Sequence, residues 1–177
     1  LSVNATTCVI SGTPTAALSA TTYTLVATNS AGTSADATVS LSVVASIPSL
    51  SYAGATGTGG TVGSALSVSP TTLTANGASV TACGIKAATT ALPGTLTVNA
   101  TTCVISGTPS AILSSTTYTL VATNSVGNSS DATVSLSVAA SVPTLSYSGA
   151  TGTSGTVGTS MLVNPTSLLA NGASVTA

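Results

Sequence analysis

Polar and apolar residues alternate along much of the chain, and the alternation predicts β-strands. In the segment 129–138, apolar side chains occupy every second position, and Asp, Thr and Ser occupy the positions between them. A period of two places the apolar side chains on one face of a strand that is buried on that face. The segment 116–123 has the same pattern. The two predicted apolar faces consist of Ala132, Val134, Leu136 and Val138, and of Tyr118, Leu120 and Ala122.

Further short strands are predicted in the same 95-residue stretch. The candidates are the segment that begins at Leu50 and Tyr52 after Pro48, and the segments 62–68, 78–85, 96–98 and 102–105. Turn-forming residues separate them, at 54–63, 76–77, 106–109 and 124–127. No segment has the period of a helix. About seven short strands with such turns predict an all-β fold, an immunoglobulin-like β-sandwich.

The chain repeats itself with a period of 95 residues. The first fourteen residues, LSVNATTCVISGTP, recur as LTVNATTCVISGTP at 96–109. Residues 1–82 and 96–177 differ at 19 of 82 positions, and most of the changes are conservative. Such close similarity is typical of recently duplicated units in a tandem array.

The strand ends near residues 45 and 140 are the natural boundaries between repeats. We therefore expect residues 1–45 to be the C-terminal part of one repeat, residues 46–140 a complete repeat, and residues 141–177 the N-terminal part of another. The chain is expected to be an excerpt of a longer tandem protein. The alternative is a subunit whose incomplete ends complement each other between neighbouring copies. The linkers are short and contain proline, which favours a stiff, extended arrangement.

The near absence of charge excludes several functions. The chain has one Lys or Arg, two Asp or Glu and no His. Nucleic-acid binding and attachment to anionic membranes both need clusters of basic residues, so neither is expected. No run of about 18 apolar residues is present, so no transmembrane helix is predicted.

Catalytic and metal-binding chemistry has too few residues to draw on. Ser and Thr are abundant, but an activated nucleophile needs an adjacent base, and Lys86 is the only lysine. Asp36 and Asp131 occupy the same position in successive repeats, so they are not expected to share a metal or catalytic site. The glycine-rich segment 54–63 lacks the lysine of a phosphate-binding loop and is expected to be a flexible loop. We predict no catalytic residue, no cofactor and no bound metal, with Lys86 facing solvent after a strand.

Two motifs resemble the immunoglobulin-like, cadherin-like tandem repeats of bacterial surface proteins. They are LPGTLTVNATTCVISGTP at 92–109 and YTLVATNSVG at 118–127. With both partial repeats counted, the resemblance covers the whole chain. It implies β-sandwich domains in long extracellular or cell-wall proteins, and it implies no enzymatic activity. One departure is that Cys8 and Cys103 stand where the family pattern commonly has glycine, which suggests a disulfide variant.

Cys83 and Cys103 lie 20 residues apart in one repeat. We predict a disulfide between them, which would tie the strand around 80–85 to the strand around 102–105. The alternative is two buried free thiols. Cys8 is the counterpart of Cys103, and its partner is expected to lie outside the 177 residues.

A neutral surface of Ser, Thr and Ala lacks the charge repulsion that keeps most proteins apart. Flat sheets that carry rows of hydroxyl groups can pack against similar surfaces. The first functional hypothesis is therefore a structural component of an extracellular filament, stalk or surface layer, with copies of itself as partners. The alternative is a cell-surface adhesin whose repeats bind a protein or a glycan. Both hypotheses place the chain outside the cell or at its surface.

Overall fold

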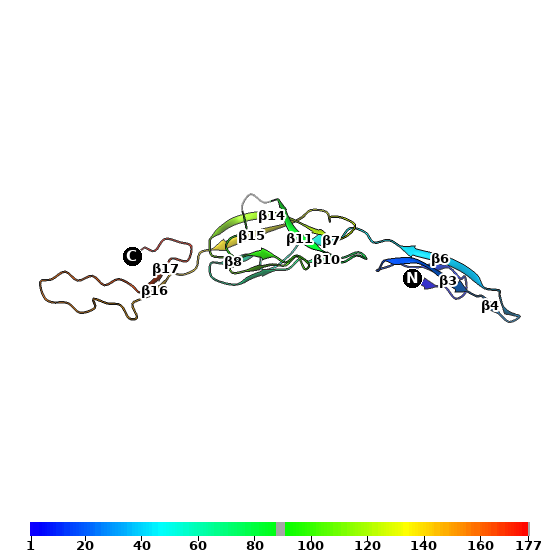
Figure 1. Ribbon diagram of the computed structural model, residues 1–177, viewed down its shortest axis with the longest axis horizontal. Coiled ribbons are helices and arrows are strands. Elements are labelled where there is room, and N and C mark those ends of the chain that lie inside the picture. The colour runs from blue at the N-terminus through cyan, green and yellow to red at the C-terminus, as the bar shows by residue number, and fades with distance from the viewer. Residues whose placement is uncertain (88–90, 177) are drawn as a thin grey trace.

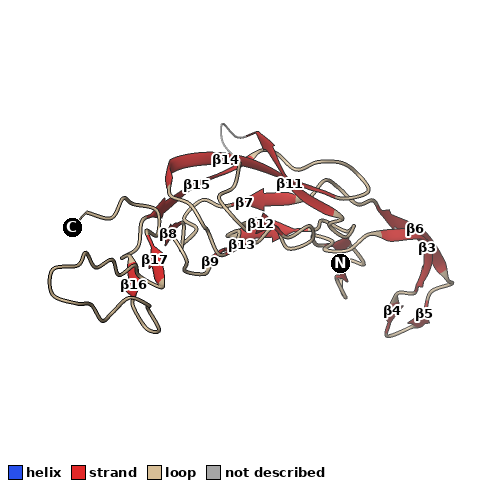
Figure 2. Ribbon diagram, turned by 60° about the vertical axis from the view of Figure 1, so that its left-hand side comes forward, coloured by secondary structure: helices blue, strands red, loops and turns tan. Residues whose placement is uncertain are grey.

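The computed structural model describes residues 1–87 and 91–176, and the repeats lie one after another along its long axis (Figure 1). The regular elements of these residues are all strands (Figure 2). The strands are β1 (Ser2–Val3), β2 (Ile10–Ser11), β3 (Leu18–Leu25), β4 (Thr28–Asn29), β5 (Gly32–Thr33), β6 (Ala37–Val43), β7 (Ser49–Ser51), β8 (Gly59–Thr61), β9 (Leu66–Val68), β10 (Thr72–Thr74), β11 (Ala82–Ala87), β12 (Thr97–Val98), β13 (Ile105–Gly107), β14 (Leu113–Thr123), β15 (Ala132–Ala139), β16 (Thr144–Ser146) and β17 (Ser167–Leu169).

The strands from β7 to β15 form a sandwich of two layers. One layer is a four-stranded sheet in the order β11-β14-β15-β8, in which β14 pairs antiparallel with both β11 and β15. The other layer holds the sheet β12-β13-β9 and the antiparallel pair β10-β7. Strand β7 packs against β14 and β15, which brings the layers together. The all-β, immunoglobulin-like fold expected from the sequence is thus confirmed.

The interior is a cluster of small aliphatic side chains around two tyrosines. Tyr118, Leu120 and Leu136 have no exposed surface, and Tyr52 and Leu66 pack onto them from the other layer with 4% and 5% exposed. Burying one such side chain stabilises a fold by roughly 1.5–3 kcal/mol. The predicted alternation of β14 and β15 is correct, because the positions predicted to face inwards are the buried ones: Tyr118, Leu120, Ala122, Ala132, Val134, Leu136 and Val138.

The glycine-rich segment 54–63 is more ordered than the sequence suggested. Its residues Gly59–Thr61 form β8, which pairs in parallel with β15, and Gly60 is opposite Val138. A Cβ atom on Gly60 would lie 3.2 Å from Cδ1 of Leu66, so a larger residue would press into the core. The strand predicted at 62–68 is confirmed only at Leu66–Val68, which form β9, because the residues before them turn the chain from β8 into β9. In this turn the Ser64 N–H donates to the Thr61 carbonyl at 3.1 Å.

Other strands are shifted or were missed. The strand predicted at 78–85 lies at Ala82–Ala87, and the strand predicted at 102–105 begins only at Ile105, because the residues before it form a turn. Strand β10 was not predicted, because its sequence Thr-Leu-Thr follows a proline and offers a single apolar residue. Nine strands therefore lie between residues 49 and 139 of the described chain, against about seven expected.

The partial repeats keep the strand pairing of the complete repeat but not its burial. Tyr23 is opposite Val39 in the β3-β6 pair, as Tyr118 is opposite Val134. Tyr23 is nevertheless 42% exposed, whereas Tyr118 is fully buried. Tyr118 is part of the buried core cluster, whereas Tyr23 lines an open pocket beside β1 and β2. The predicted boundaries after residues 45 and 140 remain predictions.

Candidate functional site

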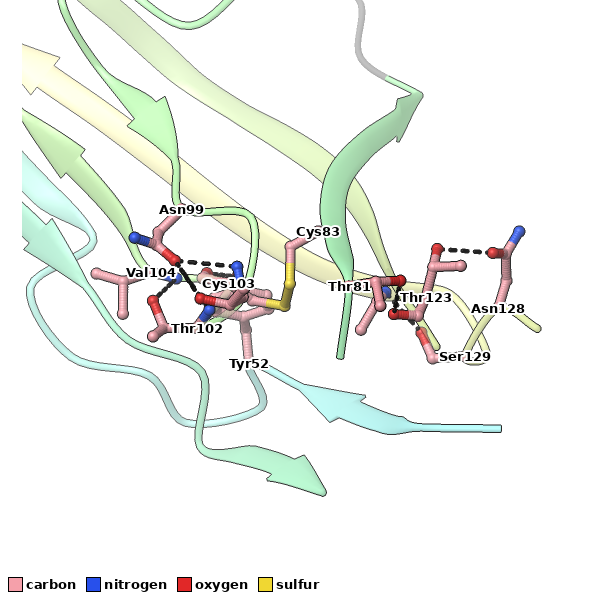
Figure 3. The surroundings of a disulfide bond; sticks show 12 residues. Tyr52, Thr81, Cys83, Asn99, Thr102, Cys103, Val104, Thr123, Asn128 and Ser129 are labelled. Atoms are coloured by element: carbon pink, nitrogen blue, oxygen red, sulfur yellow. Dashed lines mark hydrogen bonds between the residues drawn. A yellow bond between two sulfur atoms is a disulfide. The ribbon is translucent and has the colours of Figure 1, made fainter. Parts of the chain in front are cut away.

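A disulfide joins Cys83 to Cys103, with their Cα atoms 5.2 Å apart (Figure 3). Cys83 lies on β11, in the first layer of the sandwich, and Cys103 lies in the turn between β12 and β13, in the second layer. The bond therefore connects the two layers covalently. Cys103 is fully buried and Cys83 is partly buried. The bridge ends in a turn and not in the strand predicted at 102–105.

The turn that holds Cys103 is built by a local network centred on Asn99. The Asn99 side-chain oxygen accepts hydrogen bonds from the N–H groups of Thr101 and Thr102 at 3.0 and 2.9 Å. The Asn99 carbonyl accepts from the Cys103 N–H at 3.0 Å, and the Asn99 N–H donates to the Val104 carbonyl at 2.8 Å. Asparagine favours such turns because its side chain can replace a backbone acceptor.

The same turn forms in the first partial repeat, where the cysteine has no disulfide in the described chain. Asn4 accepts from the N–H groups of Thr6 and Thr7, both at 2.9 Å. The Cys8 N–H donates to the Asn4 carbonyl at 2.8 Å. Cys8 is exposed and free. The turn therefore has the same hydrogen bonds with a bridge, at Cys103, and without one, at Cys8.

Both cysteines have a left-handed backbone, with φ of 57° at Cys8 and 55° at Cys103. Residues with a Cβ atom pay roughly 1–2 kcal/mol for this conformation, which glycine adopts freely. The conformation explains why glycine commonly occupies this position in the repeats that the chain resembles. In the complete repeat, the disulfide offsets the strain.

Tyr52 holds the same turn from the opposite side. Its hydroxyl donates a hydrogen bond to the carbonyl of Cys103 across 51 residues of sequence (Figure 3). Burial raises the pKa of Tyr52 to about 12. Burial also raises the pKa of Tyr118, whose hydroxyl donates to the Ala91 carbonyl at 3.2 Å. The sequence indicated no partner for Tyr52, because the two groups meet only when the layers pack.

The charged residues of the repeat form an exposed ion pair. Lys86 Nζ lies 2.7 Å and 3.0 Å from the two carboxylate oxygens of Asp131. Their side chains are 57% and 48% exposed, and such pairs contribute about 0–1 kcal/mol. Lys86 faces solvent as expected, but it lies within β11 and does not follow a strand.

Across residues 1–87 and 91–176, no three His, Cys, Asp or Glu side chains gather as a metal site would require. The described segments also contain no helix that is long and apolar enough to cross a membrane.

Asn124 connects three segments at the end of the complete repeat that faces residues 1–45. Its side chain is 4% exposed. Its amide nitrogen donates to the carbonyls of Ser46 and Ala75 at 2.8 and 3.1 Å. Its side-chain oxygen accepts from the N–H groups of Val126 and Gly127 at 2.9 and 3.2 Å. The sequence indicated a turn at 124–127, but it did not show that Asn124 binds the linker between repeats.

The family model described as "Putative Ig domain" matches residues 1–44 and 48–139. No curated protein matched the chain, and no solved structure matched it. The two matched segments are separated at residues 45–47, which form the linker that Asn124 binds.

Proposed function

Because the chain belongs to this family of immunoglobulin-like domains, we propose that it is a structural component of an extracellular filament, stalk or surface layer built from tandem repeats. The family itself supports a surface or structural role. The observation that supports a filament, stalk or surface layer is that successive copies adopt the same strand pairing one after another along the chain. Leu145 is opposite Leu168 as Leu50 is opposite Leu73, and β3 pairs with β6 as β14 pairs with β15.

The outward surface supports lateral packing of such arrays. Hydroxyl groups line the exposed face of the main sheet, where the Thr117 and Ser135 hydroxyls lie 2.8 Å apart across β14 and β15. The chain as a whole has a net charge of −1. Copies of such a surface repel each other weakly, since electrostatic repulsion scales with charge. Hydroxyl groups that already pair within one sheet can exchange hydrogen bonds with a similar sheet beside it.

An extracellular location is supported by the disulfide. Disulfides form and persist in oxidising compartments and are rare in reducing ones. The bridge lies between the two layers, where it can support a core with no Phe or Trp. A thin aliphatic core gains most from such a covalent link, because it has less apolar area to bury.

Electron microscopy of the purified 177-residue chain tests the proposal. Regular filaments or sheets, with neighbouring chains in extensive lateral contact, are the expected result. Dispersed single chains over a wide range of protein and salt concentrations would contradict it.

The alternative role of an adhesin predicts a different result. In that case the chain would bind cells or immobilised glycans while remaining dispersed. A binding assay with the same preparation therefore separates the two functions.

A further inference from the structure

The Asn-Gly turns at 76–77 and 171–172 occupy equivalent positions in successive repeats. Both asparagines have a left-handed backbone, with φ of 53° and 50°, and both glycines have φ of 90°. Two successive positive φ values define the type I′ turn, for which Asn-Gly is the preferred sequence. Within each repeat the turn follows the short strand β10 or β17.

Each turn lies against the preceding repeat. A Cβ atom on Gly77 would lie 3.2 Å from the Ala17 nitrogen and 3.3 Å from the Ala45 Cα atom. A Cβ atom on Gly172 would lie 2.7 Å from Cγ2 of Ile112 and 3.6 Å from the Ala140 Cα atom. Ala17 and Ile112 are equivalent positions, as are Ala45 and Ala140, so the two junctions repeat the same contact.

The same turns hold the linker that enters their own repeat. The Ser46 N–H donates to the Asn76 carbonyl at 3.0 Å, and the Asn76 side-chain amide donates to the Ile47 carbonyl at 2.8 Å. At the next junction the Ser141 N–H donates to the Asn171 carbonyl at 3.1 Å, and the Asn171 amide donates to the Val142 carbonyl at 2.6 Å. The linker is thus bound at equivalent backbone atoms in both places.

Additional bonds reach the linker from other segments. Asn124 donates to the Ser46 carbonyl at 2.8 Å, so both backbone polar groups of Ser46 are engaged. At the second junction the Ser141 hydroxyl donates to the Val62 carbonyl of the preceding repeat at 2.9 Å. A linker whose backbone groups are bonded on both sides loses the rotational freedom that a flexible connection needs.

We propose that the Asn-Gly turn is an orientation lock, which docks on the preceding repeat and holds every junction of the array at one fixed angle. The partner of this surface is the neighbouring copy of the repeat itself. A constant angle at each junction makes the array a stiff rod with a regular twist. This inference deepens the proposed structural role and rests on it for its biological meaning, but the lock itself is a property of the single chain.

The lock can be tested by the relative orientation of the repeats in the full 177-residue chain. Residual dipolar couplings of the backbone amides in residues 1–44 and 48–139 should fit one common alignment tensor. The variant Gly77→Ala/Gly172→Ala places a methyl group in each contact. It should require separate tensors for the two segments, and small-angle X-ray scattering should show a shorter mean length.

A matched control separates docking from backbone strain. Gly54 and Gly149 are also equivalent positions with φ of 76°, and a Cβ atom at either would meet nothing within 4 Å. The variant Gly54→Ala/Gly149→Ala therefore introduces comparable strain away from the junctions and should keep the common tensor. If the turn variant loses its folded chemical shifts, Ala17→Asp/Ile112→Asp replaces it. These two side chains are exposed on the preceding repeat, and the change leaves the turns intact.

Three results would overturn the lock: separate tensors in the unmodified chain, a common tensor that survives in the junction variant used, or equal loosening in the control. Filament assembly is scored separately by electron microscopy. A stiff chain that does not assemble would contradict the structural function alone, and a loose chain that assembles would contradict the lock alone.

Discussion

Cys103 makes two opposing contributions to the free energy of unfolding: its disulfide stabilises the fold, and its left-handed backbone destabilises it. Variants that remove the disulfide alone, or the disulfide and the backbone strain together, should separate the two contributions. In the chain-entropy description, a bridge between residues 20 positions apart stabilises a fold by about 3 kcal/mol. The left-handed backbone at Cys103, with φ of 55°, costs roughly 1–2 kcal/mol for any residue with a Cβ atom. The cysteine therefore provides the bridge at the expense of local strain.

The comparison needs two double variants. Cys83→Ala/Cys103→Ala loses the bridge and keeps the strain, so it should lose about 3 kcal/mol of unfolding free energy. Cys83→Ala/Cys103→Gly loses the bridge but relaxes the backbone, and it should be more stable than the alanine variant by about 1 kcal/mol. The Asn99 network is retained in both, and it forms around Cys8 without a bridge.

Denaturant titration followed by circular dichroism measures both differences, and a thermal scan should show a fall of roughly 12–24 °C in Tm for the alanine variant. Cys8 is exposed and free, so Cys8→Ser should be present in every protein to prevent thiol exchange. Equal stabilities of the alanine and glycine variants would refute the strain argument. A loss below about 1 kcal/mol in both would refute the stabilising role of the bridge.

Three further predictions concern the rest of the complete repeat. Because the pKa of Tyr52 is raised from 10.0 to about 12, its contribution to stability is present below pH 10 and is lost as the pH rises through 12. Tyr52→Phe should cost about 1 kcal/mol at pH 8 and should flatten the alkaline loss, as measured by denaturation at pH 8 and 11; an unchanged alkaline slope would refute it. Lys86→Met should change the unfolding free energy by less than about 1 kcal/mol, and the change should vanish in 1 M salt; a larger, salt-independent loss would show that the pair with Asp131 does more than the exposed geometry indicates. Residues 46–140 expressed alone should unfold cooperatively with dispersed amide resonances, since the buried cluster lies within them; a disordered spectrum would refute the predicted boundaries.

The local features of the repeat could be predicted from the sequence. The faces of β14 and β15 follow from a period of two, which needs no knowledge of the partner strand. The immunoglobulin-like fold follows from short strands separated by turn residues. The Asn99 turn is also a local feature, because its hydrogen bonds join residues at most five positions apart, and the same turn appears around Asn4 in the first partial repeat.

Strand β8 and the hydrogen bonds between distant segments depend on long-range packing and could not be predicted from the sequence. Strand β8 exists because β15 offers it an open edge, although its own sequence reads as a loop. The bond from Tyr52 to the Cys103 carbonyl joins groups 51 residues apart, and that from Asn124 to Ser46 joins groups 78 apart. Alternation and turn propensity describe neighbours along the chain, so they specify which face a side chain takes. Which distant backbone group that face meets depends on how two layers and two successive repeats pack, and only the tertiary structure determines it.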